Sequence, residues 1–125
     1  MVDPLLMAIT GIDHVQVAAP AGCEDDARAF YCGLLGLAEI PKPAQLATRG
    51  GCWFRAGAQE LHVGVEDPFM AAEKAHPGLV ADDLGAIAEK LRGAGYAVAY
   101  VEGIPGVRRF HVHDPFGNRL ELRQL

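Results

Sequence analysis

The sequence predicts an α+β fold built from two copies of one strand-helix-strand-strand-strand unit, and three observations support this prediction. Segments that alternate between apolar and polar residues, which is typical of half-buried strands, recur in a similar order in both halves of the chain. Each half holds one amphipathic helix after its first strand. Helices among predominantly β segments favour α+β. We therefore expect a single domain over residues 1–125, with unit one at about 10–66, unit two at about 75–124 and a linker near 66–74.

The first unit begins with a strand at 11–18, where the letters GIDHVQVA alternate. Three carboxylates at 24–26 suit the positive end of a helix, which then continues at helical spacing until Gly36 ends it. Prolines and a Gly-Gly pair predict a loop after this helix. The remaining strands of the unit are expected at 37–40, 52–55 and 60–65, with the last two forming a hairpin.

The second unit repeats this order. We expect a strand at 75–81, and then a helix that Asp82 and Asp83 cap and that ends near residue 94, before Gly95. A strand at 96–101 is followed by a glycine- and proline-containing loop. Two final strands at 107–113 and 119–122 are joined by the sequence DPFGN, which has the residue types of a tight turn.

Composition excludes several function classes. The chain of 125 residues has a formal net charge of −5, and clustered basic residues, on which nucleic-acid affinity mostly depends, are absent from it. No apolar run approaches the ~20 residues of a membrane span. The stretch MVDPLLMAIT lacks the features of a signal peptide. An odd number of cysteines, Cys23, Cys32 and Cys52, without a CxxC motif predicts reduced thiols in a cytoplasmic protein.

Four potential metal ligands occupy corresponding positions in the two units. His14 lies in the first strand of unit one and His62 in its last strand, while His76 begins the first strand of unit two and Glu121 lies in its last strand. Side chains alternate between the faces of a strand, so apolar neighbours toward the helix leave His14, His62 and Glu121 on the opposite face. If the two sheets pair about a twofold axis, all four groups line one concave surface. Three imidazoles and a carboxylate suit a divalent metal such as Zn, Ni, Fe, Mn or Co.

The segments IDHVQVA, ARAFYCGLLGL, ELHVGV and FHVHDPFGNRLEL carry a resemblance to the vicinal oxygen chelate superfamily, which includes glyoxalases, bleomycin-resistance proteins and dioxygenases. The resemblance spans about residues 10–124. It implies two βαβββ modules with pseudo-twofold symmetry that form half-open, barrel-like sheets, and it implies a homodimer. The family's ligand positions fall on His14, His76 and Glu121, while His62 occupies a fourth position where relatives often have Glu or Gln.

Further side chains are expected to line the same cavity. On the penultimate strand, Arg109 and His111 alternate with apolar residues and so face the metal candidates. Arg109 could bind a carboxylate or phosphonate, and His111 could contact substrate or transfer protons. Gln16 and Trp53 complete the expected substrate-binding set, and Glu121 is a second candidate for proton transfer.

Three functions are compatible with these residues. The first is a metal-dependent lyase, isomerase or thiol transferase acting on a small substrate with vicinal oxygens, with the metal as Lewis acid. The second is a metal-free protein of the bleomycin-resistance type that sequesters a drug, which would not need the ligand pattern. The third is a catalytically silent relative. Ring-cleaving dioxygenases usually have a longer chain of two domains, so that activity is not favoured.

Overall fold

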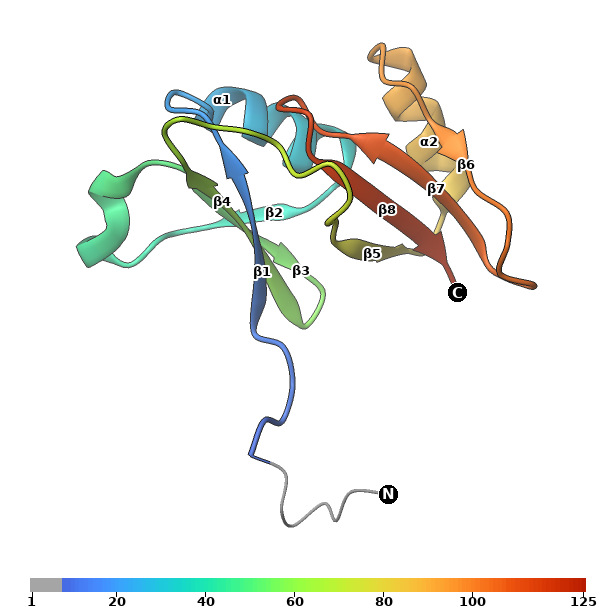
Figure 1. The fold of residues 1–125 in the computed structure, drawn as a ribbon, viewed down its shortest axis with the longest axis horizontal. Coiled ribbons are helices and arrows are strands. Elements are labelled where there is room, and N and C mark those ends of the chain that lie inside the picture. The colour runs from blue at the N-terminus through green and yellow to red at the C-terminus, as the bar shows by residue number, and fades with distance from the viewer. Residues whose placement is uncertain (1–7) are drawn as a thin grey trace.

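The computed structural model describes residues 8–125, so most of the stretch MVDPLLMAIT, which is predicted not to be a signal peptide, lies outside the described residues. Two separate four-stranded sheets lie side by side, with α1 and α2 at the top of the view in Figure 1. The first sheet has the strand order β1-β4-β3-β2 and the second β5-β8-β7-β6. In each sheet the first and last strands of the unit are parallel neighbours, and the other pairs are antiparallel. This arrangement confirms the predicted α+β fold of two βαβββ units, and the strands of the described chain form no closed barrel.

The elements follow the predicted order with adjusted bounds. The first unit contains β1 (His14–Ala19), α1 (Glu24–Ala27), η2 (Arg28–Leu34), β2 (Ala38–Ile40), η3 (Ala44–Arg49), β3 (Cys52–Ala56) and β4 (Gln59–Val65). The second unit contains β5 (Gly78–Ala81), α2 (Leu84–Gly93), β6 (Ala99–Tyr100), β7 (Arg108–His113) and β8 (Arg119–Gln124).

Three local predictions were wrong in detail. The first helix widens into the π-helical segment η2, where the amide of Leu35 donates to the carbonyl of Phe30 at 3.0 Å. The 3-10 helix η3 occupies part of the stretch that was expected to be a loop. The strand expected to begin near His76 starts only at Gly78, because Pro77 has no amide hydrogen for the ladder. His76 therefore lies in the approach to β5.

The predicted helix ends agree with the backbone. The Asp83 side chain caps α2 by accepting from the amide of Ala86 at 3.1 Å. Gly36 and Gly95 follow the two helices with positive φ angles of 76° and 91°, which residues with a side chain rarely adopt. The capping aspartate therefore marks where α2 begins, and the two glycines mark where the helices end and the chain turns back toward its sheet.

One core lies between the helices and both sheets. The segment η2 packs on β3 and on α2, and α2 packs on β8. Because alternate residues of the central strands point toward these helices, the intervening residues point away from them. The core includes Phe30, Tyr31, Phe54, Leu61, Val63, Leu84, Leu91, Phe110, Val112, Leu120 and Leu122.

Hydrogen bonds of the DPFGN turn, which joins β7 to β8, link the second unit to the first. Asp114 is only 4% exposed and accepts hydrogen bonds from the Tyr31 hydroxyl at 2.7 Å and from the amides of Phe116 and Asn118 at 2.9 Å. The Asn118 amide group donates to the carbonyl of Ala18 in β1 at 2.7 Å. The residues form the predicted turn, and in addition they link the second sheet to the first, which the sequence analysis did not predict. No helix in the described part of the chain is long and apolar enough to cross a membrane.

Candidate functional site

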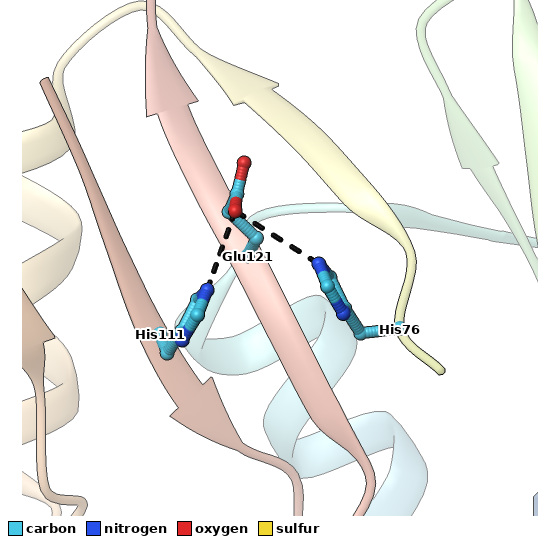
Figure 2. Close-up of side chains that lie close together, drawn as sticks. All are labelled: His76, His111 and Glu121. Carbon is cyan, nitrogen blue, oxygen red and sulfur yellow. Dashed lines mark hydrogen bonds and ion pairs between the residues drawn. The ribbon is translucent and has the colours of Figure 1, made fainter. Parts of the chain in front are cut away.

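Glu121 is a buried carboxylate on the helix-free face of the second sheet. It lies in β8 between Leu120 and Leu122, which point into the core, and its side chain is 6% exposed. On β7, His111 is its direct cross-strand partner, so both side chains project from the same face. His76 approaches from the segment before β5, as Figure 2 shows. A strand ladder and one adjoining segment therefore bring the three side chains together.

The distances among these three residues suit a metal ion. Glu121 Oε1 lies 3.3 Å from His111 Nε2 and 3.8 Å from His76 Nε2, and one ligand atom from each residue lies within 4.8 Å of the others. Metal–ligand bonds of about 2.1 Å place neighbouring ligand atoms roughly 3 to 3.5 Å apart, so small side-chain adjustments would suffice. Two imidazoles and a carboxylate are also the donor set of several divalent-metal enzymes. The residues present therefore fit a divalent ion.

The tautomer of His76 adds to this fit. Its Nδ1 lies 2.8 Å from the carbonyl of Lys74, which can only accept a hydrogen bond, so Nδ1 carries the hydrogen. In the neutral ring the lone pair is then on Nε2, the atom nearest Glu121. A ligating histidine is typically oriented in this way by a carbonyl or carboxylate.

Two arginines hold the Glu121 carboxylate. Arg109 donates to Oε1 at 2.6 Å and Arg123 donates to Oε2 at 2.5 Å. The hydrogen bond from Arg123 is the largest cause that lowers the pKa of Glu121 from 4.5 to about 2, with further lowering by Arg109 and His111 and an opposing effect of burial. Glu121 is consequently ionised at any physiological pH, which suits a ligand better than a base.

A second cluster of aromatic rings lies on the first sheet. His62 is stacked between Trp53, at a centroid distance of 3.9 Å, and His14, at 4.2 Å. Its Nε2 lies 2.9 Å from Glu60 Oε1. His14 has the arrangement typical of a ligand, since its Nδ1 lies 2.8 Å from Asp13 Oδ2 and its Nε2 is left for another partner.

Within one chain, the structure thus brings the predicted site residues together in two groups. His76, His111, Glu121 and Arg109 form the group on the second sheet, with His111 among the potential ligands and not only a substrate contact. His14, His62 and Trp53 form the group on the first sheet. Gln16 and His76 both line a cleft of about 720 Å³ between β1 and the segment before β5.

Two functional candidates were missed by the sequence analysis. Arg123 lies two residues after Glu121 on the same face of β8, and Glu60 lies two residues before His62 on the same face of β4. Strand alternation, which had identified Arg109 and His111, would have identified both residues had it been continued along each strand.

Comparisons with known proteins agree with the observed fold. The family profile described as the Glyoxalase/Bleomycin resistance protein/Dioxygenase superfamily matches residues 11–122. A solved structure from Bacillus anthracis, described as a glyoxalase family protein, is 50% identical, with a TM-score of 0.90 over 94% of this chain and 97% of that one. No protein of curated function matches the sequence.

Two more distant structures share the fold. A lactoylglutathione lyase from Agrobacterium tumefaciens is 21% identical, with a TM-score of 0.70 over 94% of this chain and 96% of that one. TnmS3, an antibiotic-binding protein from Streptomyces sp. CB03234, is 24% identical, with a TM-score of 0.72 over 94% of this chain and 98% of that one. The same fold thus occurs in proteins described as a lyase and as an antibiotic binder.

Proposed function

The chain belongs to the Glyoxalase/Bleomycin resistance protein/Dioxygenase superfamily, and we propose that it is a divalent-metal-dependent enzyme acting on a small substrate with vicinal oxygens. The observation that carries this proposal is the convergence of His76, His111 and Glu121 within 4.8 Å. The chemistry is of the lyase, isomerase or thiol-transfer type. The free thiols of its three cysteines and the absence of a membrane-crossing helix from the described residues are compatible with a cytoplasmic location.

His76, His111 and Glu121 would hold the ion, and His14 and His62 remain predicted ligands from the first sheet. Such an ion would supply Lewis-acid polarisation of substrate oxygens. A histidine that does not ligate the ion could transfer a proton to or from the substrate. Glu121 could act as a base only after losing the two arginine hydrogen bonds that lower its pKa. Gln16 and Trp53 are proposed to position the substrate.

The two half-sites suggest that a second copy of the chain completes the site. β1 and β5 are edge strands, and apolar side chains near these edges are exposed: Ile12 is 68% and Val80 65% exposed. Unpaired apolar edges favour pairing with another chain. In the homodimer we propose, β1 of one copy lies beside β5 of the other and carries His14 toward the partner's Glu121. Mixing His14→Ala protein with His76→Ala protein should then restore metal binding at one intact site in each mixed dimer.

The first experiment is elemental analysis of untagged protein purified without chelator. We expect near-stoichiometric metal in the wild type and loss of that metal in His76→Ala. His113→Ala is the matched control, because His113 is exposed on the same strand as His111 but outside the cluster, and it should retain the metal. Substrate screening of the loaded enzyme would start with hemithioacetals of α-ketoaldehydes and with epoxides. Metal-free protein after incubation with Zn, Ni, Fe and Mn would overturn the proposal.

A metal-free binding protein is the second candidate function. The observation that favours it is the engagement of Glu121 by Arg109 and Arg123, which already neutralise the carboxylate. The stacked rings of Trp53, His62 and His14 would then be an aromatic surface for a drug. Tight binding of a bleomycin-type drug by fully chelated protein would support this candidate.

A further inference from the structure

The face of the second sheet that carries Glu121 is strongly basic within an acidic chain. Three cross-strand pairs of β7 and β8 project from it: Arg109 with Arg123, His111 with Glu121, and His113 with Arg119. This face therefore has three arginines and one carboxylate, although the whole chain has a net charge of −5. Concentrated charge of one sign attracts ligands of the opposite sign.

One carboxylate does not satisfy the arginines around it. Each guanidinium has five N–H donors. Arg123 uses its Nε to bind Glu121 Oε2 and has no further side-chain partner within the described residues. Arg109 donates to Glu121 and, at 3.5 Å, to the carbonyl of Glu102, while its buried Nε has no partner in the described chain. A single arginine would neutralise Glu121, so the second one leaves a positive charge on this face.

The geometry points to an anion-binding site formed by Arg109 and Arg123, which takes a carboxylate or phosphate-type group of the substrate beside His76, His111 and Glu121. The inference rests on the proposed function, because it assigns the substrate of that site to the anionic class. Paired planar guanidiniums recognise the oxygens of such groups through parallel hydrogen bonds. Within the chain, the Glu121 carboxylate occupies part of this site as an internal anion.

Glu121 should consequently weaken anion binding while it strengthens metal binding. We would titrate chelated, metal-free protein with inorganic phosphate in chloride-poor buffer, using calorimetry and the Nε–H resonances of the arginines in NMR spectra. Arg123→Gln should weaken phosphate binding about tenfold or more, and Arg123→Lys should weaken it less, because the charge remains while the fork is lost. Glu121→Gln should strengthen phosphate binding by at least about threefold, since it removes a nearby negative charge.

Arg108→Gln is the matched control, because Arg108 is exposed on β7 and points to the opposite face, where it contacts Tyr100. It should leave phosphate binding unchanged. Equal weakening by Arg108→Gln and Arg123→Gln, or weakening by Glu121→Gln in a folded protein, would overturn the inference. Elemental analysis of the same proteins separates the two proposals. Phosphate binding without any metal site refutes only the metal-dependent enzyme, whereas metal binding with no effect of Arg123 on phosphate refutes only the anion site.

Discussion

The pKa of Glu121 makes the stability of the metal-free protein depend on pH in a way that one substitution removes. The carboxyl group has a pKa of about 2 in the folded chain against 4.5 as the reference value, chiefly because Arg123 donates to it, with Arg109 and His111 contributing. A lowered pKa stabilises the folded state fully above pH ~4.5, and this stabilisation is lost as the pH falls toward about 2. Glu121→Gln has no such titration and should lack this part of the acid sensitivity.

The magnitude follows from the shift. A difference between 4.5 and about 2 corresponds to at most about 3 kcal/mol at 1.36 kcal/mol per pH unit. Arg123 is about a third exposed, so solvent screening reduces the expected contribution to roughly 2 kcal/mol. About half of it should be lost between pH 6.5 and pH 3.5, because the unfolded chain is mostly protonated at the lower pH while the folded chain is still ionised.

Urea denaturation at pH 6.5 and pH 3.5 measures this effect. The free energy of unfolding of the wild type should fall by about 1 kcal/mol more than that of Glu121→Gln over this interval, since the other carboxylates titrate equally in both. Glu89→Gln is the control, because Glu89 is exposed on α2, and it should follow the wild type. An equal pH dependence in the wild type and Glu121→Gln would refute the reasoning and show that the arginines do not hold the carboxylate in solution.

Two substitutions test the framework that positions the site. Tyr31→Phe removes a buried hydrogen bond to Asp114. Thermal or urea unfolding should show a free energy of unfolding that is about 1 kcal/mol lower. This value is at the low end for a buried group, because other donors to Asp114 remain. No loss would show that this hydrogen bond does not link the two units. Gly51→Ala would place a methyl group 2.0 Å from a carbonyl oxygen of β4, at a residue whose φ of 83° is unfavourable for alanine. It should lower the free energy of unfolding by more than about 3 kcal/mol or prevent folding. Gly93→Ala, with no atom within 4 Å of the added carbon, is its control and should be neutral or slightly stabilising in the same measurements.

The sequence predicts those features that depend on local patterns. Alternation along β7 and β8 correctly places His111 and Glu121 on one face, and the aspartate before α2 correctly predicts its cap. Local patterns do not predict that the first helix continues as the π-helical segment η2. They also do not predict how far Pro77 delays β5, which moves His76 from a strand to the segment before it.

The grouping of the site residues depends on tertiary structure, and the sequence could not supply it. Equivalent strand positions predict that His14 and His76 play the same role in the two units, but they do not specify whether the two sheets of one chain or of two chains meet. Within the chain, His14 stacks on His62 while His76 faces Glu121. Arg123 differs from these residues, because strand alternation alone places it on the same face of β8 as Glu121 and is sufficient to predict it.

The two oxygens of Glu121 explain how the metal proposal and the anion proposal can hold together. Oε1 faces both histidines and is also the oxygen that Arg109 binds, whereas Arg123 binds Oε2. An ion ligated by Oε1 would compete with Arg109 but not with Arg123, which could stay and orient the carboxylate. Arg109, displaced from Glu121, would then have its donors available beside the ion. Loading the metal would therefore prepare the anion site, and a substrate with an anionic group would bind best to the protein that is ready to act on it.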